Sequence, residues 1–213
     1  MSIESLFENG ISLIKAITPC EASETIIVDK KPSSKEFAST ESQIGRSIPD
    51  CIRNSMGMHE YHISWIMDSL SDDLPEEYDH LCSGRTRWNL EAFRDVELDK
   101  QSISSKIKGS KKSKDILLSA FAFAYCFFDS FIALDSVGDE QGSRVVLLEI
   151  KGKAIKAVHV ISPNLDDFIK NWSDLAFFEL SIDSLSSFTD NFQKPLSSQS
   201  EFAQDYIAWL KNG

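Results

Sequence analysis

Four short apolar segments lie almost end to end between residues 116 and 161, and they constrain the fold more than any other feature of this sequence. They cover residues 116–125, 127–134, 144–150 and 154–161. The polar links between them are too short to hold crossover helices, so neighbouring strands should be antiparallel. In the last segment side chains alternate so that one side should face a core and the other should be partly solvated.

Helical patterns precede these strands. Apolar residues recur at roughly helical spacing over residues 3–17, with fraying expected at Gly10. Ser33 and Glu36 stand at the spacing of a capping box, which predicts a helix that ends near Gly45. The N-terminal part of the chain is therefore expected to be largely helical.

A short helix and a further strand come next. Pro49 suits the first turn of a helix over residues 50–56, because its missing N–H costs nothing there. Residues 61–67 alternate between two faces, which is a strand pattern. We expect that this strand could extend the later sheet.

Two helices are expected after the last strand. Ser162-Pro163 should cap an amphipathic helix over residues 165–175, with carboxylates in its first turn. A serine-rich connector over residues 181–200 leads to a final helix, which Ser198 should open. That helix carries aromatic side chains that need cover, so it should be docked on the rest of the protein.

Two charged segments are expected to lie on the surface. Residues 100–114 contain six lysines among serines and glycines, which predicts a mobile basic loop. Residues 68–79 contain six carboxylates in twelve positions and no basic side chain, which predicts an exposed loop or helix edge. These six residues are Asp68, Asp72, Asp73, Glu76, Glu77 and Asp79.

Composition limits the class of protein. The net charge of −11 over 213 residues argues against a protein whose main task is to hold phosphate backbones, so direct nucleic-acid binding is not expected. Four scattered cysteines without a CxxC pair and an N-terminus without a basic region favour the reducing cytoplasm. The most apolar run, residues 116–128, is shorter than the roughly 20 residues of a membrane-spanning helix.

Catalytic and metal-binding patterns are weak. His59 and His62 stand three apart rather than at the spacing of a zinc-binding helix, and ordinary polar histidines are the commoner case. No phosphate-binding loop or nucleophile elbow is present in the sequence. Asp129 interrupts two apolar runs, which is compatible with a catalytic acid or base but is commoner for a turn residue. The residues therefore favour binding over catalysis, with no cofactor and no metal.

The order of several short motifs resembles the SUKH superfamily over residues 37–175. Residues 41–49 (ESQIGRSIP) are similar to the helix and the Gly-x-x-Leu-Pro step of that family, with Ile48 in place of leucine. Further matches are Ile63-Ser-Trp65, Ser83-Gly84, Trp88-Asn-Leu90, residues 129–135 (DSFIALD) with Gly142 and Val145, and residues 165–169 (LDDFI). The resemblance implies an α+β fold, a mainly antiparallel sheet flanked by helices, with an extra C-terminal helix. We expect a single domain over residues 1–213, with a SUKH-like core at about 33–178 and a C-terminal helical extension at about 179–213.

The resemblance also implies a function. Bacterial SUKH proteins are mostly immunity proteins of polymorphic toxin systems, which neutralise a cognate toxin domain by stoichiometric binding and have no catalytic residues. Such a toxin is often a nuclease or another nucleic-acid-directed enzyme, whose basic cleft would attract an acidic inhibitor. The acidic residues of segment 68–79 are the expected toxin-binding surface.

Two other classes stay open. A non-catalytic intracellular scaffold or adaptor of the same superfamily would recognise a peptide or several partners, and the segments 100–114 and 181–200 would suit it. An enzyme would need a pocket around Asp129 or the histidines. Gene context separates the first two classes, because a neighbouring toxin gene supports immunity.

Overall fold

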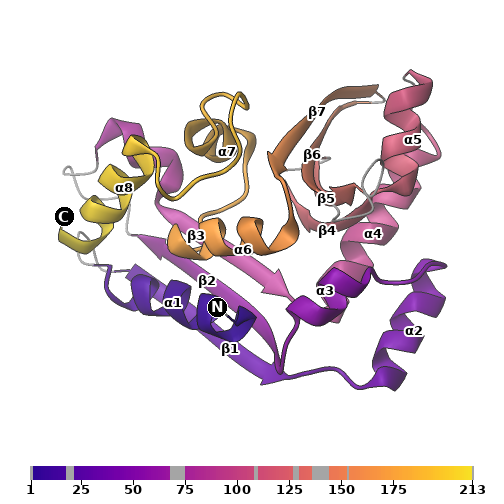
Figure 1. Cartoon of the computed structure of the whole chain (residues 1–213), viewed down its shortest axis with the longest axis horizontal. Coiled ribbons are helices and arrows are strands. Elements are labelled where there is room, and N and C mark those ends of the chain that lie inside the picture. Colours follow the sequence, from indigo (N-terminus) through magenta and orange to yellow (C-terminus); the bar gives the residue numbers. More distant parts are fainter. Residues whose placement is uncertain are drawn as a thin grey trace.

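The computed structural model has two antiparallel sheets with helices around them, which confirms the expected α+β class (Figure 1). The structure describes residues 2–17, 22–67, 75–107, 110–126, 130–135, 144–152 and 154–212. The described strands form a three-stranded sheet in the order β1-β2-β3 and a four-stranded sheet in the order β4-β5-β6-β7.

The three-stranded sheet consists of β1 (Ala22–Lys30), β2 (His59–Met67) and β3 (Ser83–Trp88). Tyr61, Ile63, Trp65 and Met67 are buried on one face of β2, which confirms the strand predicted over residues 61–67. The prediction that β2 could extend the later sheet is wrong. Both edges of β2 are taken, by β1 on one side and β3 on the other. The sequence pattern did not reveal β1, because its Ile27 and Val28 are exposed and give no burial signal.

The four-stranded sheet is the one that the four apolar segments predicted. It consists of β4 (Phe121–Tyr125), β5 (Phe131–Asp135), β6 (Arg144–Lys151) and β7 (Ala154–Ser162), all paired antiparallel in chain order. The first expected strand begins late, because Ile116 and Leu117 belong to helix α5 and β4 starts at Phe121. Both residues are buried, and a short apolar run does not separate a buried helix from a strand.

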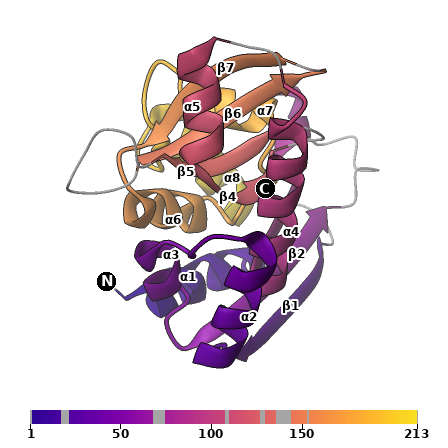
Figure 2. The same cartoon turned by 90° about the vertical axis from the view of Figure 1, so that its right-hand side faces the viewer.

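Helices cover both sheets. The helices in chain order are α1 (Ile3–Lys15), α2 (Ser34–Ile44), α3 (Asp50–Ser55), the 3₁₀ helix η1 (Glu76–Leu81), α4 (Leu90–Ser104), α5 (Lys111–Ser119), α6 (Leu165–Asp174), α7 (Ile182–Phe188) and α8 (Glu201–Asn212). Figure 2 shows α4 and α5 beside the four-stranded sheet. A smaller core cluster lies under α4 and α5, and the larger cluster joins the other face of that sheet to the three-stranded sheet.

Several expected helix ends are confirmed and two are wrong. Ser33 and Glu36 form the predicted capping box, and α2 ends at Gly45 in the left-handed conformation. α6 is capped by Asn164 rather than Ser162, whose side chain is buried. Ser198 does not open α8, because its hydroxyl donates to Asp174 and helix residues start at Glu201.

Two segments are more helical than the sequence predicted. α1 runs through Gly10 without a break, and Gly10 is buried against the Phe177 ring, where a side chain would overlap that ring. The serine-rich connector over residues 181–200 contains the helix α7. Ser181 caps this helix through the N–H of Ser184.

The segment 100–114, predicted as a mobile basic loop, is mostly helical. α4 extends to Ser104 and α5 begins at Lys111. Lys100 is 1% exposed and pairs with Glu97, which is 0% exposed. Lys100 is therefore part of the core rather than of a solvated loop.

Two tryptophans fix the chain after α6. Ala176 and Phe177 adopt positive φ angles of 59° and 51°. The indole N–H of Trp65 donates to the Ala176 carbonyl oxygen at 2.6 Å. The indole N–H of Trp172 donates to the carbonyl oxygen of Phe178 at 2.8 Å. These bonds hold the segment 176–178, named here the tryptophan-clamped turn, beside the edge of β3.

Candidate functional site

The predicted acidic residues are partly within the described structure. Glu76, Glu77 and Asp79 are exposed on η1, as expected for a surface segment. Asp68, Asp72 and Asp73 lie outside the described residues. The structure therefore brings together three of the six carboxylates on one short helix.

Tyr78 packs η1 against α8. The buried ring of Tyr78 contacts three aromatic rings of α8, with centroid distances of 5.7 Å to Phe202, 5.6 Å to Tyr206 and 5.0 Å to Trp209. The Tyr206 hydroxyl donates to the Leu81 carbonyl oxygen at 3.0 Å, at the end of η1. The last helix is docked as expected, and η1, which carries the acidic residues, packs against it.

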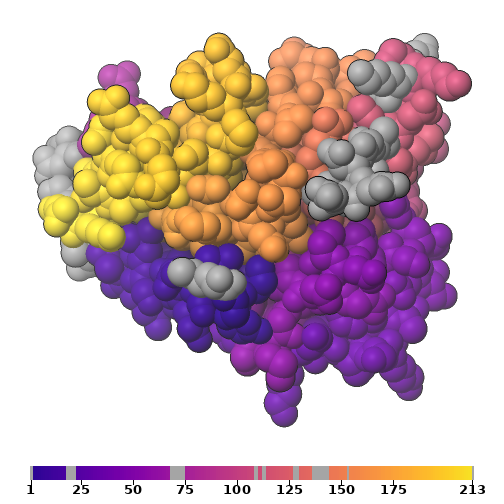
Figure 3. Space-filling model, in the orientation of Figure 1, coloured from indigo at the N-terminus to yellow at the C-terminus, as the bar shows by residue number. Residues whose placement is uncertain are grey.

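The acidic character continues onto α8. Burial raises the pKa of Tyr78, and the neighbouring carboxylates of Glu77 and Asp205 raise it further. Asp205 is exposed on α8 and was not among the predicted residues, because it is more than a hundred positions away in the sequence. We call Glu76, Glu77, Asp79 and Asp205 the η1–α8 acidic surface. In Figure 3 the C-terminal residues, in yellow, cover one end of the molecule.

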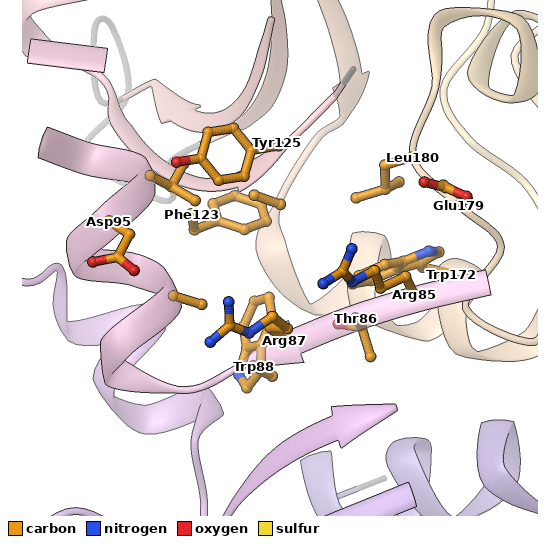
Figure 4. Close-up of a pocket in the computed structure, with 13 residues that line it drawn as sticks. Arg85, Thr86, Arg87, Trp88, Asp95, Phe123, Tyr125, Trp172, Glu179 and Leu180 are labelled. Carbon is orange, nitrogen blue, oxygen red and sulfur yellow. The ribbon is translucent and has the colours of Figure 1, made fainter. Parts of the chain in front are cut away.

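A second feature is a pocket between the two sheets that sequence reasoning did not reveal. It has a volume of about 500 Å³ and is lined by β3, α4, β4 and the segment after α6. Figure 4 shows Arg85 and Arg87 of β3 on one side and Phe123 and Tyr125 of β4 on another. Such volumes fall in the range of ligand sites, and the lining combines apolar rings with a few charged groups.

The carboxylates around this pocket have hydrogen-bond or ion-pair partners, whereas one nitrogen of Arg87 has none among the described residues. Asp95 pairs with Arg94 at 2.7 Å, and the Glu179 carboxylate accepts from the Ser83 hydroxyl at 2.9 Å. Arg87 donates to Glu91 through one terminal nitrogen at 3.1 Å, while its buried Nε–H has no acceptor among the described residues.

Tyr125 lies at the rim of the pocket. Burial, and then the hydrogen bond to Asp99, raise the pKa of the Tyr125 hydroxyl, which donates to Asp99 at 2.5 Å. The Tyr125 hydroxyl therefore stays neutral and donates a hydrogen bond to Asp99 of α4. The sequence placed residues 116–125 in a strand but offered no signal that α4 would face Tyr125.

The histidines do not converge. His59 and His62 both lie on β2, and His62 is paired with Arg87 across the sheet. Burial lowers the pKa of His62, and the charges of Arg87 and Arg85 lower it further. His80 Nε2 lies 3.0 Å from the Ser187 hydroxyl. No group of three or more metal-ligating side chains occurs in the described ranges. Asp129 lies outside them.

Comparisons with family models, with curated proteins and with solved structures find no match to this chain. The SUKH resemblance therefore stays a prediction. What the fold defines is an α+β protein with two antiparallel sheets. Within the described segments, no helix combines the length and apolar character needed to cross a membrane.

Proposed function

We propose that this protein is a cytoplasmic immunity protein that binds a cognate toxin domain and neutralises it by stoichiometric protein–protein inhibition. The observation that carries the proposal is the η1–α8 acidic surface. Its carboxylates Glu76, Glu77 and Asp79 are exposed, while Tyr78 between them is buried against α8. The proposed partner is a toxin with a basic surface, and the proposal requires no cofactor and no catalytic residue.

The physical argument rests on charge and on rigidity. A nuclease or another nucleic-acid-directed toxin has a basic cleft that holds phosphates, so carboxylates on an inhibitor are attracted to it and compete with nucleic acid. A backbone segment that is already fixed loses less conformational freedom on binding than a mobile one. Because Tyr78 fixes η1 on α8, the backbone that carries the carboxylates needs little further ordering.

A scaffold or adaptor that recognises a peptide is the second candidate. The pocket beside β3 favours it, since this pocket combines cationic side chains with apolar rings and lies along a sheet edge. Gene context separates the candidates, because a neighbouring gene for a large toxin supports immunity.

Co-expression with the product of the adjacent gene tests the first proposal. We expect an equimolar complex on size exclusion and restored growth of cells that express the toxin. Failure to form a complex at micromolar concentrations would count against neutralisation.

A matched pair of variants tests the surface. The variant Glu76→Gln, Glu77→Gln, Asp79→Asn should weaken the complex. The control Asp29→Asn, Asp50→Asn, Asp115→Asn removes the same charge from exposed positions on β1, α3 and α5 and should leave it unchanged. Equal weakening by both variants would reject the η1–α8 acidic surface as the contact.

A further inference from the structure

The edge of β3 is open along part of its length. β3 is the last strand of its sheet, and its outer edge is met by the chain itself at one bridge, Gly84 with Phe178. The Glu179 N–H donates to the Ser83 carbonyl oxygen at 3.0 Å, so the backbone groups of Ser83 point away from β2. Groups two residues apart in a strand point to the same edge, so those of Arg85 and Arg87 also point outward.

No neighbour completes this edge in the part of the chain that the structure describes. Through this bridge the segment 177–179 meets the Ser83 carbonyl oxygen and the Arg85 N–H, whereas no backbone hydrogen bond from another described segment reaches the Arg85 carbonyl oxygen or the backbone of Arg87 on the outer side. The pocket of about 500 Å³ lies along this stretch and is bounded by α4 and β4. An unpaired sheet edge next to an open volume is the arrangement that accepts an added strand.

The side chains at this edge define the chemistry of an occupant. The guanidinium of Arg85 is exposed and has no hydrogen bond or ion pair with another described residue. The nearby carboxylates of Asp95 and Glu179 are already engaged by Arg94 and Ser83. The buried Nε–H of Arg87 lacks an acceptor among the described groups. An acidic side chain would supply an acceptor to the exposed guanidinium of Arg85, because carboxylates accept from guanidinium groups in a two-pronged geometry.

The wall of the pocket defines a second requirement. Phe123 of β4, Trp172 of α6 and Leu180 line it and are at most 6% exposed, whereas Tyr125 at the rim is 42% exposed (Figure 4). An apolar side chain of the occupant would remove the exposed surface of the Tyr125 ring from water. In an extended peptide neighbouring side chains point to opposite sides, so acidic and apolar side chains can meet Arg85 and the Tyr125 ring at once.

From these observations we propose that the outer edge of β3 between Arg85 and Trp88 binds an extended peptide segment of a partner protein. The peptide adds as a strand, places an acidic side chain on Arg85, and places an apolar side chain against the Tyr125 ring at the rim of the pocket. This site is separate from the η1–α8 acidic surface and takes ligands of the opposite charge.

Peptide selection tests this proposal on the intact protein. A phage-displayed library of random peptides of about six residues, the usual length of a strand, is selected against the immobilised full chain. We expect enrichment of peptides that carry an acidic residue among apolar ones. Binding of the enriched peptides, made synthetically, should weaken about tenfold or more in Arg85→Glu. The control Lys35→Glu reverses an exposed charge on α2 and should bind as the wild type does.

Backbone-methylated peptides separate strand addition from other modes on the unaltered protein. Methylation of alternate peptide nitrogens removes the N–H donors to β3, so one of the two methylation patterns should abolish binding. The proposal is overturned if no peptide is enriched, if Arg85→Glu binds normally, or if both methylated peptides bind normally. The triple variant of the η1–α8 acidic surface should retain peptide binding, so failure of one proposal is distinguishable from failure of the other.

Discussion

Glu97 is a carboxylate that is 0% exposed and contacts several charged side chains in the core. Its Oε1 lies 3.0 Å from Lys100 Nζ and 3.3 Å from Arg46 Nη1. Its Oε2 accepts from the Ala122 N–H at 2.9 Å, and so ties α4 to β4. Burial lowers the pKa of Lys100, while the charge of Glu97 acts against that shift. A buried pair of this kind is sensitive to the loss of one partner.

Removal of Glu97 alone should be costly. Glu97→Leu leaves the buried ammonium of Lys100 without its counter-charge and the Ala122 N–H without its acceptor, and we expect a loss of about 3–5 kcal/mol in the free energy of unfolding. Glu97→Leu, Lys100→Leu should recover more than half of that loss. Urea denaturation measures both, with Glu91→Gln as an exposed control on the same helix. A single variant as stable as the wild type would contradict the account of this pair.

Glu149 provides a pH-dependent contribution to stability. Burial tends to raise its pKa, but hydrogen bonds from Lys156 at 2.7 Å and from His159 at 3.4 Å together lower the pKa below the ordinary 4.5. Because the pKa in the folded state is lowered, the contribution is present above pH 4.5 and is lost as the pH falls through the folded-state pKa. Unfolding free energies measured from about pH 6 to about pH 3 should fall less steeply in Glu149→Gln than in the wild type. Parallel profiles would show that this carboxylate makes no such contribution.

At the scale of elements, Gly84 decides how closely β3 approaches the tryptophan-clamped turn. A Cβ at this position would overlap the Trp65 indole nitrogen and the Phe177 carbonyl oxygen. Gly84→Ala should therefore destabilise the protein by about 1–3 kcal/mol, the usual cost of overpacking. Chemical denaturation measures this, and Ser64→Ala on the neighbouring strand serves as the control. An unchanged stability would mean that the turn is free to move away from β3.

The elements that the sequence predicted well are those whose signal is local. The capping box at Ser33 and Glu36 and the alternation in β2 each depend on residues within one turn or one strand. The predictions failed where tertiary contacts decide. Lys100 can be buried on α4 because its ammonium pairs with Glu97 and donates to the Ala120 carbonyl oxygen just after α5. β1 forms because it pairs with the edge of β2.

In the candidate site, too, local features could be predicted and features that depend on tertiary contacts could not. Exposure of Glu76, Glu77 and Asp79 could be predicted from the composition of the segment. Asp205 and the pocket could not, because they depend on how α8 meets η1 and how β4 faces β3. Pairings between segments far apart in one sequence leave no local pattern.

At the scale of the whole molecule, the C-terminal segment is part of the larger core. Leu185, Phe188, Leu196, Tyr206 and Leu210 are buried in the same cluster as residues of the three-stranded sheet. Without this segment, side chains of the cluster that it covers would be exposed to water, at a cost of about 1.5–3 kcal/mol for each large apolar side chain.

Removal of residues 181–213 should therefore abolish cooperative unfolding. Urea titration followed by tryptophan fluorescence would detect this, because Trp65 and Trp172 lie in the same cluster. Removal of residues 211–213 alone keeps Leu210 and should change little. A cooperative transition in the longer deletion would mean that the rest of the chain folds without this segment.

The central claim is that the η1–α8 acidic surface attracts a basic toxin domain. Its most direct test is the association rate with the product of the adjacent toxin gene, measured at ionic strengths from about 0.01 M to about 0.15 M. For the wild type the rate should fall steeply with salt. In Glu76→Gln, Glu77→Gln, Asp79→Asn it should be about tenfold or more slower at low salt and should fall less steeply with salt. Association of this variant at the wild-type rate, with the same salt dependence, would contradict the claim.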